Sequence, residues 1–106
     1  MRNLKEMLRE MSDRKVLTLS NKVWDAYCDD GEFGIGFAIY VDSKEAAKML
    51  ECVDFDIDTP EDLANAMMVY RDGCTEEAYL KSELRRIKAR EAEIKARLKE
   101  LESIVA

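Results

Sequence analysis

An acidic segment near the middle of the chain, VDFDIDTPED at residues 53–62, alternates aspartates with apolar residues and then adds two more acids. Carboxylates at this density could bind a metal ion, form the solvent face of a strand, or present negative charge to a partner. A calcium-binding loop that starts at Asp54 needs a glycine at its sixth position and a glutamate at its twelfth. The sequence places Thr59 and Asn65 there, so we predict no bound metal ion.

The same segment fits an edge strand whose apolar side chains point inward and whose aspartates point outward, since charges on an edge discourage unwanted strand pairing. Outward side chains on a strand lie ~6.6–6.8 Å apart, about twice the ~3.4 Å spacing of phosphates along one DNA strand. A turn is predicted at residues 29–31, where DDG precedes another acid. The predicted partner-binding residues are the acids of the turn region and of the strand: Asp29, Asp30, Glu32, Asp54, Asp56 and Asp58.

The net charge of −6 hides an uneven distribution. Residues 1–22 and residues 81–106 each carry +3, whereas residues 23–80 hold three bases and fifteen acids and carry −12. Acids in turns and at helix N-termini, where the helix dipole favours them, account for about half of this excess. The remaining carboxylates repel one another, and a cationic protein partner would relieve that repulsion.

Side chains suited to catalysis are scarce. The chain has no histidine, which excludes Ser-His and Cys-His nucleophiles and removes the group that titrates nearest neutral pH. The glycine-rich GEFGIGF at residues 31–37 lacks the lysine and the Ser/Thr of a phosphate-binding loop. We therefore predict neither an enzyme nor a cofactor site.

The three cysteines, Cys28, Cys52 and Cys74, are odd in number and widely spaced. This pattern argues against disulfides and thiolate metal sites, so each is predicted to be a small buried hydrophobe in a reducing cytosol. The N-terminus carries charges throughout, unlike a signal peptide, and no apolar run approaches the ~20 residues of a membrane helix. The prediction is a cytoplasmic protein with no membrane span.

The elements that would position the acids form a mixed fold. Residues 22–28 fit either a strand or a helix, and the turn that follows favours the strand. Gly34, Gly36 and Ala38 would make one side of the next strand small enough for another element to approach closely. The expected elements before the acidic segment are a helix at residues 3–12, strands at 16–19, 22–28 and 32–41, and a helix that starts at Asp42 or Ser43.

Two further helices have clear boundary signals. The segment at residues 59–73 has Thr59 as N-cap, Pro60 at the first helical position and Gly73 as the stop. Thr75 would cap a last helix that runs to about residue 104. We predict an α+β fold, with a small antiparallel β-sheet, short helices and a long C-terminal coiled-coil-type helix. It would comprise a compact acidic α+β domain at residues 1–74 and a dimerising helix at residues 75–106.

The last helix carries a heptad pattern with one fault, Glu91. Between residues 81 and 103, eight bases are interleaved with five acids, many at i,i+4, such as Glu91 with Lys95 and Glu93 with Arg97. This is typical of a solvated coiled-coil face, and it argues against direct binding of nucleic acid. We predict a homodimer through the apolar heptad residues Leu80, Leu84, Ile87, Ile94, Leu98 and Leu101.

These observations favour a non-catalytic protein–protein interaction module whose acids occupy a nucleic-acid-binding site on a basic partner, such as a nuclease complex. Small, acidic, enzymatically silent proteins of this kind are typical of phage and mobile-element inhibitors, including anti-restriction and anti-CRISPR proteins. Two alternatives stay open. One is a dimeric coiled-coil adaptor in which the acids only confer solubility, and the other is a small regulator that contacts DNA through the last helix.

Overall fold

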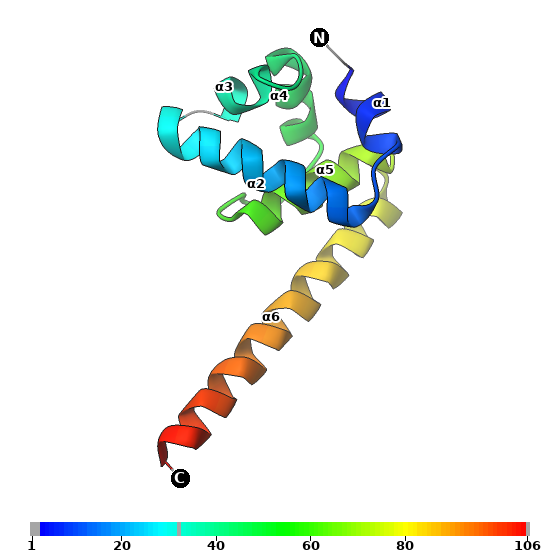
Figure 1. Ribbon diagram of the computed structural model, residues 1–106. Coiled ribbons are helices and arrows are strands. Elements are labelled where there is room, and N and C mark those ends of the chain that lie inside the picture. The colour runs from blue at the N-terminus through cyan, green and yellow to red at the C-terminus, as the bar shows by residue number, and fades with distance from the viewer. Residues whose placement is uncertain (1–2, 32, 106) are drawn as a thin grey trace.

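A computed structural model describes residues 3–31 and 33–105, and this part of the chain folds as helices with no β-sheet (Figure 1). A head of five helices occupies the N-terminal two thirds, and one long helix leaves it. The helices are α1 (Leu4–Arg9), α2 (Asp13–Asp30), α3 (Phe33–Ala38), α4 (Ser43–Glu51), α5 (Pro60–Arg71) and α6 (Glu76–Val105).

The predicted α+β fold is therefore wrong, and α2 shows why. It absorbs both predicted strands at residues 16–19 and 22–28, because Val16, Leu19 and Val23 recur at helical spacing and all face the core. Ser12 caps the helix by accepting a hydrogen bond from the Lys15 N–H at 3.3 Å. The turn signal at residues 29–31 that favoured a strand was misleading, and the helical alternative for residues 22–28 is the correct one.

The predicted strand at residues 32–41 is also wrong, since α3 occupies most of the described part of it. The expectation that its small residues permit a close approach is confirmed at Gly36, which is buried against α2. A Cβ at this position would lie 2.9 Å from the Val23 carbonyl oxygen. Ala38, in contrast, is exposed.

The variant Gly36→Ala is expected to lower the free energy of unfolding by about 1–3 kcal/mol, the usual cost of overpacking. The sign of this change separates overpacking from helix propensity. Without the close contact, alanine would stabilise a helix interior by about 1 kcal/mol relative to glycine. Urea unfolding followed by circular dichroism measures the effect. Ala47→Val, at an exposed position of α4, is the matched control and should change stability little. A Gly36→Ala protein as stable as wild type would contradict the close packing of α3 on α2.

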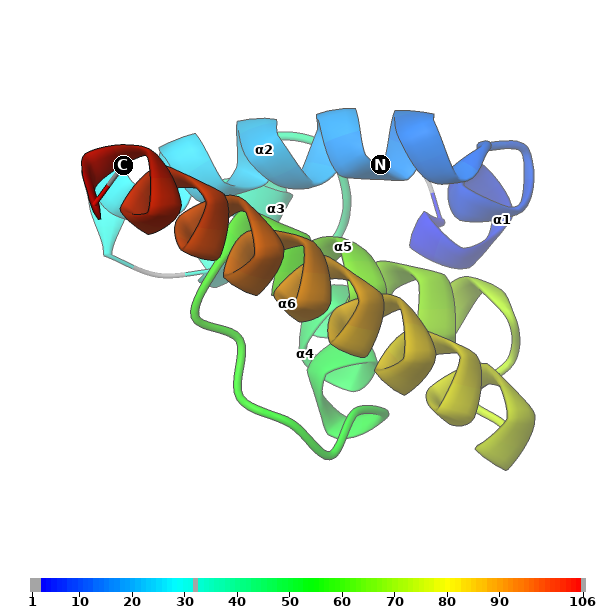
Figure 2. The same ribbon diagram turned by 90° about the horizontal axis from the view of Figure 1, so that it is seen from below.

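Helix α5 is the centre of the head. All its residues from Leu63 to Val69 are buried, and α1, α2, α4 and α6 each pack against it (Figure 2). Its boundaries are as predicted: Thr59 accepts a hydrogen bond from the Asp62 N–H at 3.1 Å, Pro60 begins the helix, and Gly73 follows its end with φ +96°. A helix apolar on all sides needs this coverage to fold.

A carboxylate on α4 ties the ends of the head together. Glu45 accepts hydrogen bonds from the backbone N–H of Leu4 at 2.6 Å and of Lys5 at 3.3 Å. The Tyr70 hydroxyl donates to the same carboxylate at 3.0 Å. Burial first, and then the Glu45 carboxylate, raise the pKa of Tyr70 above its ordinary value. Glu45 therefore has a structural role, because its carboxylate joins α4 to the start of α1 and to the end of α5.

Helix α6 begins as predicted after Thr75, whose hydroxyl accepts a hydrogen bond from the Ala78 N–H at 3.1 Å. Ala78 and Ser82 are buried against the head, whereas every residue from 88 to 104 is exposed. The second half of α6 therefore projects away from the other helices (Figure 1). None of the described helices combines the length and apolar character needed to cross a bilayer.

Candidate partner-binding surfaces

The residues between α4 and α5 form an extended segment that we call the acidic strap, residues 53–58. It pairs with no strand in the described part of the chain, so the predicted edge strand is wrong. Its inward and outward sides are as predicted. Val53, Phe55 and Ile57 are half-buried against the core, and the alternating aspartates Asp54, Asp56 and Asp58 are exposed. The alternation survives because an extended chain lying on a core has the same period of two as a strand.

Contacts with α5 and α6 hold the strap in place. The Phe55 ring lies 6.2 Å from the Tyr79 ring, and the Arg86 guanidinium covers Phe55 at 4.3 Å. The Tyr79 hydroxyl donates to the Asp54 carbonyl oxygen at 3.3 Å, and the Asp58 N–H donates to Asp62 at 3.1 Å. The backbone and the apolar side chains are thus fixed.

The three strap carboxylates take no part in these contacts. Those of Asp54, Asp56 and Asp58 form no hydrogen bond or ion pair with any residue that the structure describes. Other acids of the middle region are engaged, such as Asp62 with Arg86 at 3.5 Å and Asp72 with Arg71 at 3.1 Å. The strap therefore presents three unpaired negative charges on a fixed backbone.

The remaining predicted partner-binding acids lie around the end of α2. Asp29 is exposed near the C-terminus of that helix, and Gly31 caps it with φ +79°. Asp30 ends the helix, and its side chain, like the whole of Glu32, lies outside the described part. The grouping of these acids with the strap stays a prediction.

A disulfide between Cys52 and Cys74 anchors the start of the strap, with the two Cα atoms 5.7 Å apart. The prediction of three unpaired, buried cysteines is therefore wrong, and Cys28 is exposed. The bonded cysteines lie 22 positions apart in the sequence, and the chain between them includes all of α5. This helix carries the chain back beside its starting point, which sequence spacing alone does not show.

Removal of this disulfide by Cys52→Ser and Cys74→Ser is expected to lower the free energy of unfolding by about 3 kcal/mol, from the entropy of closing a loop of this length. Urea unfolding with and without reductant measures it. The reductant should bring the wild-type protein to the stability of the double variant. Cys28→Ser is the control and should unfold like wild type. Equal midpoints for all proteins would show that the bond does not form.

The seam of α6 comprises Leu80, Leu84, Ile87, Ile94, Leu98 and Leu101, and every one of them is exposed, from 41% at Leu101 to 60% at Ile87. This includes Leu80 and Leu84 in the half that touches the head. The head packs instead on the other side of α6, through Ala78 and Ser82. The seam is thus open along its whole length, about 30 Å at ~1.5 Å per residue.

Ion pairs on α6 follow the predicted pattern in part. Lys95 binds Glu91 at 2.9 Å, as expected. Glu93 instead binds Arg90 at 3.2 Å, and Arg97 binds Glu100 at 3.0 Å. The cations of the exposed half are therefore largely paired within the helix.

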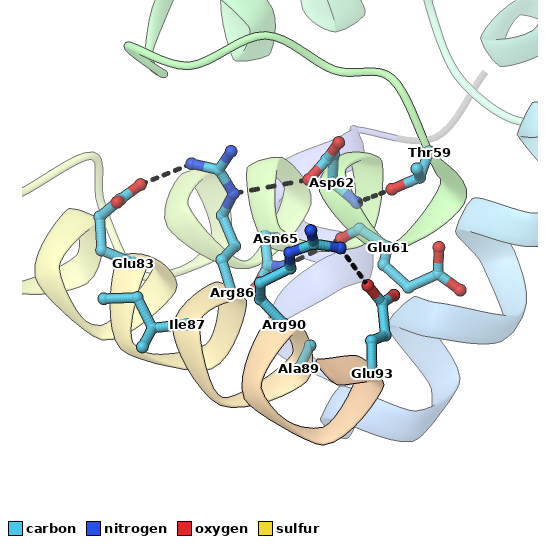
Figure 3. A pocket seen from close by; sticks show the side chains of 10 residues that line it. All are labelled: Thr59, Glu61, Asp62, Asn65, Glu83, Arg86, Ile87, Ala89, Arg90 and Glu93. Atoms are coloured by element: carbon cyan, nitrogen blue, oxygen red, sulfur yellow. Dashed lines mark hydrogen bonds and ion pairs between the residues drawn. The ribbon is translucent and has the colours of Figure 1, made fainter. Parts of the chain in front are cut away.

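A groove that the sequence did not indicate lies between the start of α5 and α6 and encloses about 410 Å³ (Figure 3). Arg86 bridges its two sides, with Glu83 at 2.6 Å on its own helix and Asp62 at 3.5 Å on α5. Four acids and two arginines line it: Glu61, Asp62, Glu83, Glu93, Arg86 and Arg90. It could not be predicted because its two walls meet only through the packing of α6 on α5.

The interface beside this groove contains two unsatisfied polar atoms. The Arg85 Nε–H donates to the Asn65 side-chain oxygen at 3.1 Å, but Arg85 Nη2 and the Ser82 hydroxyl are buried without a partner among the described residues. Within the same part of the chain, no three Cys, Asp or Glu side chains converge as metal ligands would. Most charges of the groove pair with one another, Arg86 with Asp62 and Glu83, and Arg90 with Glu93.

No family model, curated protein or solved structure matches this chain. The strap, the seam and the groove are therefore the features that bear on its function.

Proposed function

We propose that this chain is a non-catalytic protein–protein interaction module that presents the acidic strap to a basic, nucleic-acid-binding surface of another protein and self-associates through α6. The observation that carries the proposal is the strap itself. Asp54, Asp56 and Asp58 are exposed and unpaired, while Phe55 and the backbone are fixed by α5 and α6. A backbone that is held in place before binding loses little conformational entropy on binding, which favours affinity.

Such a surface suits arginine and lysine side chains that otherwise contact phosphates. Charge-assisted hydrogen bonds from these cations to carboxylates are among the stronger polar contacts in interfaces. The charge of −12 on residues 23–80 would also speed encounter with a basic partner. The proposed class is an inhibitor of a nuclease or related complex, as in anti-restriction and anti-CRISPR proteins of phages and mobile elements.

An adaptor protein is the second candidate, and the open seam of α6 favours it. In that case the coiled coil is the functional element, and the acids only keep the protein soluble. Direct contact of α6 with DNA has less support, because Lys81, Arg90, Lys95 and Arg97 are each paired with a glutamate of the same helix.

The proposed site of action is the cytoplasm, where nucleases that act on invading DNA meet their substrate. The Cys52–Cys74 disulfide argues against this compartment, since glutathione and thioredoxin keep most cytosolic thiols reduced. Alkylation of free thiols in intact cells, followed by mass analysis, would show whether the pair is oxidised where the protein acts.

The experiment that separates the inhibitor from the adaptor is competition. A panel of purified DNA nucleases would be titrated with the protein, with nucleic-acid binding and cleavage measured together at several salt concentrations. An inhibitor should displace DNA from one panel member, and its affinity should fall steeply with salt, because exposed charge pairs are screened over ~8–10 Å. Binding that is insensitive to salt and leaves DNA bound would instead support the adaptor.

A further inference from the structure

The flanks of the seam carry information about how two copies would pair, given the self-association proposed above. The seam steps alternately by four and three residues, which assigns every α6 residue to a heptad position. Leu84, Glu91 and Leu98 take position a, and Leu80, Ile87, Ile94 and Leu101 take position d. The flanking positions e hold Lys81, Lys88, Lys95 and Glu102, and positions g hold Glu83, Arg90 and Arg97.

We propose that two copies of α6 pair in parallel and in register, and that the Glu91 carboxylate in the seam binds Arg90 of the second copy. The occupant of the seam is then a second copy of this chain. Three features of the structure support this pairing: the charges beside the seam, the surroundings of Glu91, and the acidic groove next to Arg90.

The flanking charges favour the parallel orientation. In a parallel pair, each g residue faces the e residue five places later on the other helix. Glu83 then faces Lys88 and Arg97 faces Glu102, and symmetry makes each attraction occur twice. Among the flanking pairs, the one repulsive combination is Arg90 facing Lys95. Within the seam, the two Glu91 carboxylates also face each other, because a parallel pair sets each a residue opposite its own copy.

The antiparallel orientation reverses this balance. When two α6 helices overlap fully in opposite directions, Lys88 faces Lys95 and Arg90 faces Arg97. Both repulsions occur twice, and the only attraction joins Lys81 to Glu102. Antiparallel pairing also sets Glu91 opposite the apolar Ile94.

Glu91 and the cations beside it offset each other's repulsion: the carboxylates lie between Arg90 and Lys95, and these cations in turn separate the two Glu91 charges. An a-position side chain lies beside the g residue that precedes the matching a residue of the other helix, so Glu91 of one copy meets Arg90 of the other. It already binds Lys95 of its own chain at 2.9 Å. Each carboxylate would thus sit between the two cations that repel each other. A charge in a seam is tolerated only with such partners.

The groove adds complementarity on the same side of the helix. Ile87 and Arg90 line both the groove and the edge of the seam, and the groove contains four acids against two arginines. Arg90 is already drawn toward Glu93 at 3.2 Å, as Figure 3 shows. Lys88 and Lys95 of the second copy would run along this net-negative edge.

Parallel pairing has a consequence for the proposed inhibitor. Both heads would lie at the same end of the coiled coil, on its outer sides, because the head packs on the side of α6 that carries Ala78 and Ser82. Two acidic straps would then face one partner assembly together. Simultaneous engagement of two sites can strengthen binding by about 10²–10⁴-fold without new contacts.

Cysteine cross-linking tests the orientation in full-length protein. Leu101→Cys in a Cys28→Ser background brings two thiols together at position d only in a parallel pair, so we expect covalent dimers in a glutathione buffer. The antiparallel control is a mixture of the Leu84→Cys and Leu101→Cys proteins, which should give no mixed product.

A mixed disulfide, or a dimer by light scattering without the Leu101 cross-link, would overturn the orientation alone. A monomeric wild type would overturn self-association itself, and a monomer that sediments with anionic vesicles would assign the seam to a membrane surface.

A charge exchange tests Glu91. Glu91→Lys should weaken dimerisation by about tenfold or more, because three cations then meet in the seam. Arg90→Glu combined with Glu91→Lys should restore most of the affinity by exchanging the two charges. Glu100→Lys, which removes an ion pair outside the seam, is the matched control and should leave the dimer intact. Equal dissociation constants for all four proteins would overturn the Glu91–Arg90 contact.

Discussion

The double variant Ile87→Asp, Ile94→Asp is expected to be a monomer at micromolar concentrations at which the wild-type protein is a dimer. Both side chains are exposed, at 60% and 46%, and both lie at d positions in the middle of the seam. In a dimer the two substitutions would place four carboxylates in a dry interface. Each would cost several kcal/mol, so the dissociation constant should rise by about 10³-fold or more. Light scattering coupled to size exclusion gives the mass of both proteins.

The control for this experiment is Ile39→Asp. Ile39 is also exposed, at 64%, but it lies in the head between α3 and α4. This variant should remain a dimer if the seam is the interface. Circular dichroism should show an intact head in both variants. The second half of α6 should fray in the monomer, because an isolated helix of this length is only marginally stable in water. A wild-type mass of one chain would exclude the predicted dimer.

The helices that could be predicted are those with strong local signals. Thr59, Pro60 and Gly73 marked the boundaries of α5, and Asp42 caps α4 through the Lys44 N–H at 2.8 Å. The heptad spacing of α6 needed no tertiary information either. In each case the cap or the period acts within a few residues, so the sequence contains the whole cause.

The strands failed because short apolar windows fit two periods. Between residues 22 and 28, alternation and helical spacing were both present, and packing of α2 against α3 and α5 decided between them. In α3, Gly36, which would weaken a strand, serves a helix crossing, because a Cβ at this position would lie 2.9 Å from the Val23 carbonyl oxygen. Context of this kind overrides local propensity.

Only half of the candidate site could be predicted from the sequence. The exposure of Asp54, Asp56 and Asp58 followed from their alternation with apolar residues. The surface that holds them did not, since Tyr79 and Arg86 reach the strap only after α6 packs on α5. The disulfide and the groove depend on the same long-range contacts, and no local pattern encodes them.

The variant Asp54→Lys, Asp56→Lys is expected to lose about a hundredfold or more in affinity for a basic nuclease that the wild-type protein inhibits. Two attractions become two repulsions at the centre of the proposed surface, and charge pairs that are close and partly desolvated in an interface are worth about 1.5 kcal/mol or more each. The head should stay folded, because both side chains are exposed and neither carboxylate forms a hydrogen bond or ion pair with a described residue. Its stability should not fall, since the reversal removes repulsion along the strap. The measurements are inhibition of cleavage and competition with DNA.

The matched control is Glu6→Lys, Glu10→Lys, which makes the same change in net charge on exposed residues of α1 and its C-cap. If long-range charge alone drives binding, both variants should weaken it equally and both effects should vanish at high salt. If the strap is the contact surface, the strap variant should lose far more, and part of its loss should persist at high salt, because contacts inside an interface are screened less than exposed charges. A strap variant that inhibits as well as wild type would leave the aspartates as a solvated face and make the adaptor the better account of this protein.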